Sequence, residues 1–393
     1  MAKFDTDVLI VGAGPTGLAL AVDLQLAGVN YLLLEALSTA STTSRAAVVH
    51  AQTLEALKPL GIVGKLLSEG LELRKFTIRD RDSALLDVEF GHLPTPFPFT
   101  LMIPQNRTEA ILANRLGELG GSIAREHRVV RVQYDSDGAT VTVASPNGER
   151  EIRTRYLIGA DGMHSVVRQS TSIGFEGETY GESFVLADVR MAWPLGRKEV
   201  SLLFSPGGLV VVAPLPDGST RIVATVEDAP EHPSIEFVQQ LLERRGPGRS
   251  TTKVHELIWS TRFRVHHRLA SRYRDGRALV MGDAAHVHSP AGGQGMNTGL
   301  VDAVVLAEAL IADLQHGDQA ALDRYAEVRR PAAHEVLQLA SRLTRMATTR
   351  SAFMRQLRNF VLRVLNRAEP FKQRLALSLS GISRRSRASL IGQ

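Results

Sequence analysis

A glycine-rich motif between two short apolar runs, close to the start of the chain, constrains the fold more than any other feature. The apolar run 8–11 leads directly into Gly12-Ala13-Gly14-Pro15-Thr16-Gly17, which fits the pattern G-x-G-x-x-G. Residues 18–26 then have helical spacing, and the apolar run 31–34 is typical of a buried strand. Strand, glycine turn, helix and strand in this order predict a βαβ unit of the dinucleotide-binding type.

Each glycine of the motif has its own physical task. Gly12 permits the tight turn, Gly14 lets the backbone approach a pyrophosphate, and Gly17 lets the helix pack closely on the sheet. Glu35 follows the second strand, where a carboxylate can accept the hydroxyl groups of an adenosine ribose but disfavours a 2′-phosphate. The motif therefore predicts a site for FAD or NAD rather than NADP. A purely structural glycine turn is the alternative.

Two further loops follow apolar strands later in the chain. Residues 159–168 contain Asp161-Gly162, a pair that taken alone indicates only a turn. Residues 282–286, which read Gly-Asp-Ala-Ala-His, lead through the glycine-rich loop 290–297 into a helix. A helix start offers free N–H groups and the positive end of the helix dipole, so this loop would stabilise negative charge on a ligand.

The three motifs, in this order and at these distances, resemble those of the class A flavoprotein hydroxylases, the family of para-hydroxybenzoate hydroxylase and phenol hydroxylase. The resemblance covers nearly the whole chain. It is strongest to the aromatic polyketide hydroxylases, whose pattern includes segments similar to 44–46 and 104–107. Larger polyketide hydroxylases carry an additional thioredoxin-like domain at the C-terminus, and this chain stops about where that domain would start, after residues 379–381.

The resemblance implies an α/β fold in which a Rossmann-like FAD-binding domain carries an inserted β-sheet substrate domain and C-terminal helices. The chain itself has strand-like runs over most of 180–270 and helical patterns after 296. We expect a discontinuous FAD-binding domain at 1–70, 100–175 and 271–345, a β-rich substrate-binding domain at 71–99 and 176–270, and a helical tail at 346–393.

The resemblance also assigns residues to a non-covalently bound FAD. Gly12, Gly14 and Gly17 would hold its pyrophosphate and Glu35 its ribose, and Thr16 of the same motif is also expected to bind the cofactor. Arg45 and Gln105 would lie near the phosphate–ribityl part, and Asp283 would bind the ribityl chain. Asp161 and Gly162 match the second fingerprint of the family, which is associated with both FAD and NAD(P)H. The residues expected beside the isoalloxazine are Pro290, Gly293, Gln294, Gly295, Met296 and Asn297. Catalytic roles are expected for Arg45, which would balance an anionic reduced cofactor, for His286 and for Pro290. His286 and His288 lack the carboxylate partners of a metal site, so no metal is predicted.

The activity that the resemblance implies is insertion of one oxygen atom from O2 into an aromatic, phenolic substrate of the polyketide type, through a flavin C4a-hydroperoxide. NADPH or NADH would be the reductant. A second G-x-G-x-x-G is missing from the sequence, which agrees with a nicotinamide that binds only transiently. The alternatives are a Baeyer–Villiger or epoxidising FAD monooxygenase of the same fold and a non-enzymatic FAD-binding protein.

Composition limits the remaining classes. The chain has no cysteine, which excludes disulfides and a cysteine nucleophile and leaves redox chemistry to a cofactor. The net charge of +5 is small against 46 basic and 41 acidic residues, and no nucleic-acid motif is found, so nucleic acid is not expected as a partner. Neither a signal peptide nor a run of about 20 apolar residues is visible. These features predict a soluble, cytoplasmic protein, and a homodimer is left open.

Overall fold

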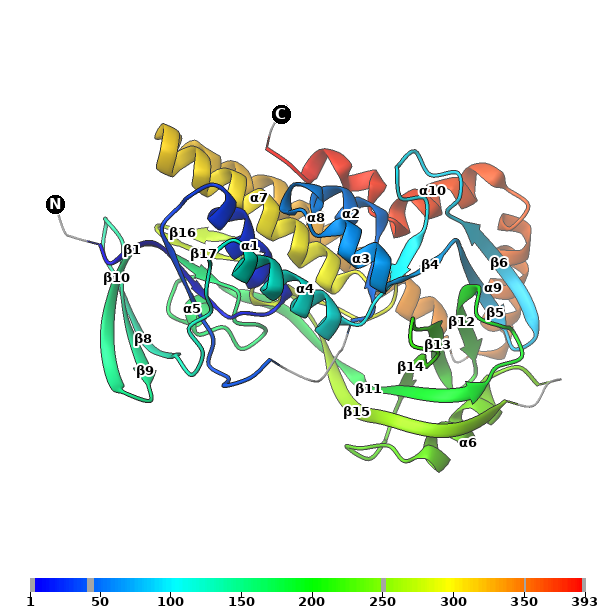
Figure 1. Ribbon diagram of the computed structural model, residues 1–393. Coiled ribbons are helices and arrows are strands. Elements are labelled where there is room, and N and C mark those ends of the chain that lie inside the picture. The colour runs from blue at the N-terminus through cyan, green and yellow to red at the C-terminus, as the bar shows by residue number, and fades with distance from the viewer. Residues whose placement is uncertain (1–3, 41–45, 249–251, 350, 391–393) are drawn as a thin grey trace.

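The computed structural model describes residues 4–40, 46–248, 252–349 and 351–390 of the chain (Figure 1). In this part of the chain a seven-stranded sheet follows the order β16-β17-β10-β1-β2, and β9 and β8 extend it from β10. The strands β2, β1, β10 and β17 are parallel neighbours, so their carboxyl ends lie at one edge. The strand bounds are β1 Thr6–Val11, β2 Tyr31–Leu34, β8 Arg128–Tyr134, β9 Ala139–Ser145, β10 Gly148–Gly159, β16 Arg274–Asp275 and β17 Ala278–Val280.

Helices pack against the parallel part of this sheet and against one another: α1 (Pro15–Leu26), α4 (Gln105–Glu118), α7 (Gly295–His316) and α8 (Ala320–Ala347). Helix α1 contacts both α4 and α7, and α7 contacts α8. Their apolar side chains share one large buried cluster with β1 and β2. One face of β1, with Val8 and Ile10, packs on these helices, and the other face, with Leu9 and Val11, packs on β8 and β9. Burial on both faces explains why the run 8–11 is apolar without alternation.

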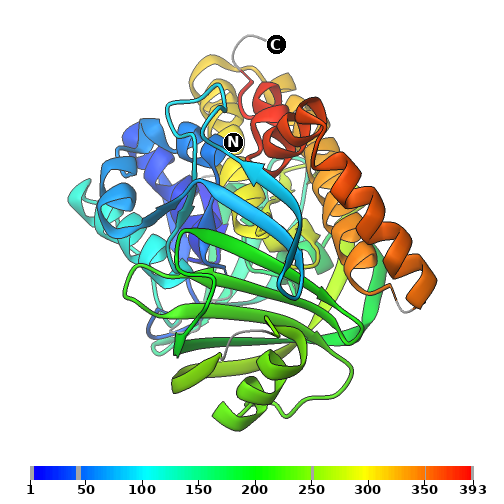
Figure 2. The same cartoon turned by 90° about the vertical axis from the view of Figure 1, so that its right-hand side faces the viewer.

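A second sheet of eight strands lies beside the first and follows the order β18-β15-β11-β14-β13-β12-β5-β6 (Figure 2). One of its faces packs on α6 (Ile235–Arg245), and the other packs on the C-terminal helices. Side chains alternate between the faces, so Phe204 and Leu203 point in opposite directions. The strand bounds are β5 Lys75–Asp80, β6 Ser83–Glu89, β11 Phe175–Ala192, β12 Glu199–Ser205, β13 Gly208–Pro214, β14 Thr220–Val226, β15 Lys253–Ala270 and β18 His286–Val287.

A three-stranded sheet contacts both larger sheets. It consists of β3 (Val48–Val49), β7 (Thr100–Met102) and β4 (Leu71–Leu73), and its side chains belong to apolar clusters with α1 and with β13. Between β3 and β4 the chain forms three short helices, α2 Ala51–Ala56, η1 Lys58–Leu60 and α3 Val63–Glu69. The predicted α/β architecture with sheet-rich insertions and C-terminal helices is confirmed. The domain boundaries at particular residue numbers stay an interpretation.

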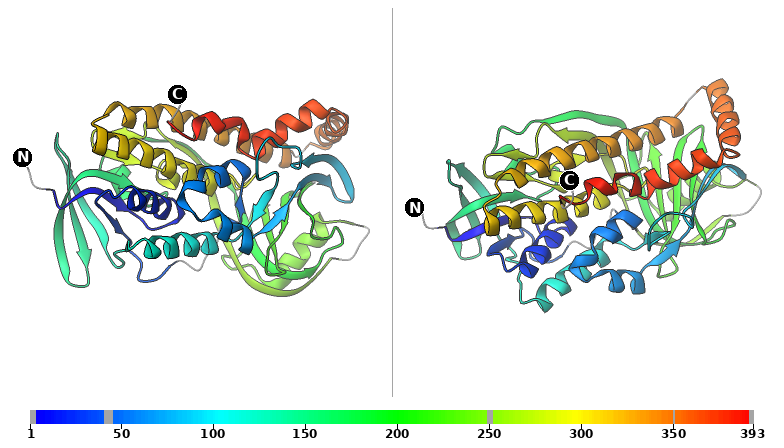
Figure 3. Two further views of the ribbon diagram at one scale, coloured as in Figure 1. Left: turned by 45° about the horizontal axis from the view of Figure 1, so that its top comes forward. Right: turned by 90° about the horizontal axis from the view of Figure 1, so that it is seen from above.

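The C-terminal segment folds back over the molecule, as Figure 3 shows in its right-hand view. Helix α9 (Ala352–Leu365) turns the chain, α10 (Glu369–Leu379) contacts β6, and the short helix η3 (Ile382–Arg387) contacts α2 and α8. Part of one face of α9 stays exposed, with the side chains Phe353, Met354, Leu357, Phe360, Val361 and Val364. The tail is therefore part of the fold, and its last turn reaches the neighbourhood of the glycine-rich loop before α7.

Helix α7 is long and apolar enough to cross a membrane by length and composition. However, 78% of its most apolar window is buried inside the protein, between α1 and α8. This burial identifies α7 as a core helix, and the cytoplasmic location stays a prediction.

Candidate cofactor site

The turn between β1 and α1 contains two glycines that the protein itself requires. A Cβ atom on Gly17 would lie 1.9 Å from the carbonyl oxygen of Gly12, and one on Gly12 would lie 2.5 Å from that of Ala160. Gly12 also has a φ of +101°, which side-chain-bearing residues rarely adopt. Gly14 differs, because a Cβ there would meet no atom within 4 Å. The space in front of Gly14 is open, as the approach of a pyrophosphate requires.

Glu35 is held at the mouth of this turn by two backbone groups. Its Oε2 accepts a hydrogen bond from the Ala13 amide at 2.9 Å, and its Oε1 accepts one from the Leu37 amide, also at 2.9 Å. The side chain is half-buried, and each carboxylate oxygen can accept a further hydrogen bond. The carboxylate is thus fixed beside the glycine turn, which supports the predicted contact with ribose.

The second motif lies next to the first, because β10 pairs with β1 and Gly159 stands opposite Val11. The Asp161 side chain turns back on its own loop, where Oδ2 accepts hydrogen bonds from the amides of Val166 and Val167 at 2.7 and 3.3 Å. Gly162 has a φ of +76°. The motif forms the predicted tight turn, and in this geometry Asp161 braces it.

Arg168, at the end of the second motif, connects this motif to the third. It donates hydrogen bonds to the carbonyl oxygens of Met163 and Ala284, both at 2.7 Å, and its guanidinium stacks 3.8 Å from the ring centroid of Phe175. Ala284 belongs to η2 (Gly282–Ala284), the turn after β17. No local sequence pattern predicts this role of Arg168, because its partner Ala284 lies 116 residues away.

The third motif packs directly on the first. A Cβ on Gly282 would lie 2.8 Å from the Thr16 hydroxyl oxygen, and a Cβ on Gly299 of α7 would lie 2.6 Å from it. Thr16 therefore occupies a space that two glycines leave open. Asp283, by contrast, is exposed at the same edge of the sheet. The three predicted motifs meet here, at the carboxyl ends of β1, β10 and β17.

A fully buried ion cluster fixes the third motif to α7. Asp302 accepts hydrogen bonds from Arg329 Nε at 2.8 Å and from the Gly282 amide at 3.1 Å, and it lies 2.6 Å from His286 Nε2. Burial alone would raise the pKa of Asp302, but the neighbouring His286 and Arg329 outweigh it and lower the pKa. The His286 ring is 0% exposed. The catalytic role of His286 stays a prediction, but this geometry supports a positioning role.

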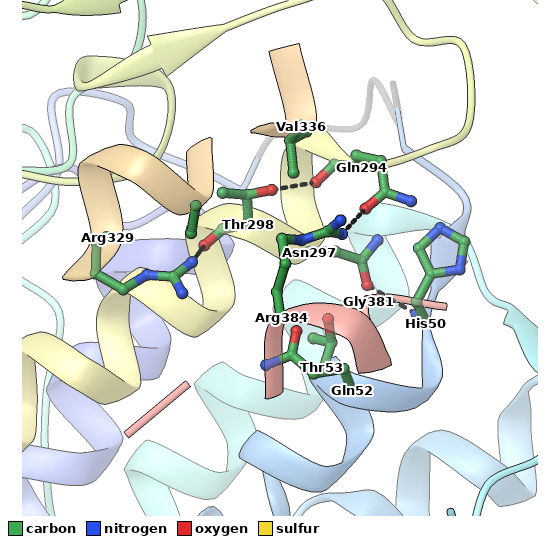
Figure 4. Close-up of a pocket in the computed structure, with 11 residues that line it drawn as sticks. His50, Gln52, Thr53, Gln294, Asn297, Thr298, Arg329, Val336, Gly381 and Arg384 are labelled. Atoms are coloured by element: carbon green, nitrogen blue, oxygen red, sulfur yellow. Dashed lines mark hydrogen bonds between the residues drawn. The ribbon is translucent and has the colours of Figure 1, made fainter. Parts of the chain in front are cut away.

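The side chains of the loop before α7 point into the protein (Figure 4). Asn297 accepts a hydrogen bond from the His50 amide at 2.7 Å and donates to the carbonyl oxygens of Val48 and Gly293 at 2.9 and 2.8 Å. Gln294 donates to the carbonyl oxygen of Leu379 at 2.8 Å. Because the first turn of α7 has neither a side-chain cap nor an acidic residue, its backbone N–H groups are available to a ligand.

The predicted residue Arg45 lies outside the described residues, but its neighbour Ala46 is firmly held. Gln105 Oε1 accepts a hydrogen bond from the Ala46 amide at 3.2 Å, and the Ala46 carbonyl oxygen accepts one from Arg221 at 2.9 Å. Arg221 is itself in a buried ion pair with Asp188, with distances of 2.8 and 2.7 Å. Gln105 thus anchors Ala46, the residue that follows Arg45 in the sequence. No local sequence pattern predicts that Arg221 binds Ala46, since the two residues lie 175 positions apart.

Comparison with known proteins identifies the cofactor of this site. A family model described as an FAD binding domain matches residues 5–340. The chain belongs to this FAD-binding family. The family, the predicted cofactor FAD and the predicted resemblance are thereby confirmed.

Curated relatives of this family member include several monooxygenases. The 12-dehydrotetracycline 5-monooxygenase/anhydrotetracycline 6-monooxygenase of Streptomyces rimosus is 38% identical over 348 residues, which cover 84% of this chain and 68% of the relative. The rifampicin monooxygenase of Streptomyces venezuelae is 34% identical over 341 residues, covering 84% of this chain and 69% of the relative. The predicted enzyme class, an FAD-dependent monooxygenase, is confirmed.

Solved structures agree over nearly the full length. The p-nitrophenol 4-monooxygenase from Pseudomonas putida superposes with a TM-score of 0.87 at 26% identity, covering 98% of this chain and 99% of that one. The ternary complex of aklavinone-11 hydroxylase with FAD and aklavinone gives a TM-score of 0.75 at 27% identity, and the match covers 88% of this chain and 70% of that one. The fold of this family member is therefore that of FAD-dependent hydroxylases.

The geometry of the described residues fits FAD. The open face of Gly14 and the uncapped starts of α1 and α7 would offer backbone N–H groups to anionic parts of the cofactor, and Glu35 would offer a carboxylate to its ribose. The individual FAD contacts, including those of Asp283 and Pro290, stay predictions.

We predict that Gly14→Ala weakens FAD binding at least about tenfold, a loss of about 1.4 kcal/mol, while the apoprotein folds normally. The added methyl group meets no protein atom, so it interferes only with what approaches the turn. Titration of apoprotein with FAD, followed by flavin fluorescence, measures the change. Gly117→Ala in α4 is the matched control, because its Cβ also meets no atom within 4 Å. Equal FAD affinity of the two variants would contradict the prediction.

We also predict that Asp302→Asn destabilises the apoprotein by about 3–5 kcal/mol, because it removes the charge that balances buried Arg329. Asp323→Asn is the control, since Asp323 is 67% exposed and pairs with Arg274 at the surface. Such a pair contributes about 0–1 kcal/mol. Urea denaturation of both apoproteins measures the difference, and similar midpoints would show that the buried cluster adds nothing.

Proposed function

We propose that this FAD-dependent monooxygenase hydroxylates a polycyclic phenol of the aromatic polyketide type, with NADPH or NADH as the source of electrons. One atom of O2 enters the substrate, and the other leaves as water. The relatives named for tetracycline-type substrates and the complex with aklavinone support this substrate class. A Baeyer–Villiger or epoxidation outcome on the same substrates is the alternative.

The observation that carries the proposal is the apolar sheet face beside the predicted isoalloxazine loop. Ala291 of that loop belongs to the same buried cluster as Phe184 and Phe204 of the eight-stranded sheet. Partly buried apolar side chains pack against this cluster, namely Phe76, Val211, Val223 and Phe263. Phe184 and Phe263 stack with ring centroids 5.9 Å apart. The C-terminal helices cover part of this face, but the partly buried side chains Phe76 and Phe263 can offer flat, apolar contacts to fused aromatic rings.

The protein positions the cofactor and the phenol and keeps water away from them. Bound FAD supplies the redox chemistry that uses O2 and nicotinamide electrons. The glycine turn and Glu35 hold the adenosine and pyrophosphate end, and the α7 start stabilises negative charge at the other end. The sheet face orients the phenol and keeps water away, which limits loss of reducing power to H2O2.

His288, near the same loop, does not suit proton transfer at neutral pH. Burial lowers its pKa to about 4, so the ring is neutral, and its Nδ1 lies 2.8 Å from the Ser289 carbonyl oxygen. The catalytic roles of Arg45 and Pro290 stay predictions. A phenolic substrate supplies part of its own activation, so a protein base is not needed for the reaction.

The purified protein tests the proposal. We expect flavin absorption bands, phenol-stimulated oxidation of NADPH or NADH, and a product heavier by one oxygen atom that carries label from ¹⁸O2. NMR of the product separates hydroxylation from ring expansion or epoxidation. Flavin reduction with only H2O2 as product, across single-ring and polycyclic phenols, would contradict this substrate class.

We predict that Phe263→Ala raises KM for a polycyclic phenol about tenfold, consistent with the loss of a large buried apolar contact. FAD affinity should not change. Ile258→Ala on the same strand is the control, because Ile258 is 42% exposed, and its KM should match the wild type. Steady-state kinetics at saturating NADPH and O2 measure both variants. An unchanged KM in Phe263→Ala would place the substrate elsewhere.

The assembly is a separate question. The sequence leaves a homodimer open, and light scattering of the FAD-loaded protein measures its mass in solution.

A further inference from the structure

Arg384, in the last helical turn of the tail, carries a buried charge without a carboxylate partner among the described residues. The residue is 8% exposed. Its guanidinium donates to Gln294 Oε1 at 3.1 Å and to the Ser378 carbonyl oxygen at 3.3 Å, both of which are neutral. Two other buried arginines are balanced, since Arg329 pairs with Asp302 and Arg221 pairs with Asp188.

The charged groups around Arg384 do not offset its charge. Arg329 lines the same small cavity (Figure 4) and repels Arg384. Glu335 attracts Arg384, but it is already paired with Arg387 at 2.7 Å. Burial lowers the pKa of Arg384 to about 10, which still leaves it charged at neutral pH. A buried charge without a counter-charge is costly, so a compensating anion nearby would be favourable.

The partner of Arg384 identifies where that anion would lie. Gln294 is the residue that precedes the first turn of α7, and Arg384 holds its side-chain oxygen. The start of α7 is itself the positive end of a 22-residue helix. Two positive elements therefore converge on the loop 290–297. His50, which also lines the cavity, adds no charge of its own, because burial lowers its pKa to about 4 and keeps the ring neutral.

We propose that Arg384 tunes the FAD of this enzyme, by adding to the start of α7 a positive charge that favours the reduced, negatively charged cofactor. Hydride transfer from NAD(P)H adds two electrons and one proton to the flavin, and so leaves it with one additional negative charge. Arg384 acts through the loop and is a positioning and electrostatic residue. The inference rests on the proposed placement of the isoalloxazine beside residues 290–297.

The experiment compares the two-electron reduction potential of FAD-loaded variants, equilibrated with a dye of known potential. Arg384→Gln removes the charge, and we expect it to lower the equilibrium constant for reduction about tenfold, which is about 30 mV for two electrons. Arg384→Lys keeps the charge and should stay within about a factor of two of the wild type. The control Arg385→Gln changes an exposed arginine of the same turn, which pairs with Glu55, and it should leave the potential unchanged.

A second variant guards against a fold defect in Arg384→Gln. Gln294→Glu places a carboxylate against the intact Arg384 guanidinium. Like Arg384→Gln, it should lower the reduction potential of the FAD. Titration of each apoprotein with oxidised FAD gives the accompanying Kd, which should change less than the reduction equilibrium does.

Equal potentials in Arg384→Gln and Arg384→Lys would overturn the proposal, as would a loss of affinity for oxidised FAD as large as the change in reduction. These measurements use no phenol. If the protein binds FAD but hydroxylates no polyketide-type substrate, the proposed function is contradicted, but the role of Arg384 can still be tested.

Discussion

Close backbone contact at the end of the parallel strands is the constraint on which the rest of the structure depends. Gly17 packs against the carbonyl oxygen of Gly12, and Gly12 packs against that of Ala160, at distances that leave no room for a side chain. Thr16 fills the gap that Gly282 and Gly299 leave. Since these residues come from three separate motifs, the cofactor site exists only when β1, β10 and β17 are aligned. Gly14, which meets no protein atom, is the point where this packed edge opens to a ligand.

Buried charges connect that edge to the helices behind it. Asp302 joins α7, α8 and the third motif in one cluster, and Asp188 with Arg221 reaches from the eight-stranded sheet to Ala46. In both clusters the acidic and basic groups balance one another inside the protein. Arg384 departs from this pattern, because its partners are neutral oxygens. An uncompensated cation beside a helix start is a feature of a site built for an anion.

The eight-stranded sheet supplies the other half of the enzyme. Its two faces have different neighbours, since one packs on α6 and the other reaches the C-terminal helices and Ala291. The second face carries stacked aromatic rings that share an apolar cluster with Ala291 of the loop before α7. In the proposed function, cofactor and substrate therefore contact different sheets, and the long strands β11 and β15 run between the two parts of the molecule (Figure 1).

The sequence by itself determined the βαβ unit, the order of the three motifs, the α/β class and, through resemblance, FAD and monooxygenase chemistry. These features are local, because a glycine turn and the period of apolar residues depend on neighbours in the chain. Only the tertiary structure decided where the side chains point. It buried His286 against Asp302, turned Asn297 and Gln294 into the protein, and assigned anchoring roles to Arg168 and Arg221. These contacts join residues 16 to 249 positions apart, so they follow from sheet register and helix packing, which no local pattern encodes.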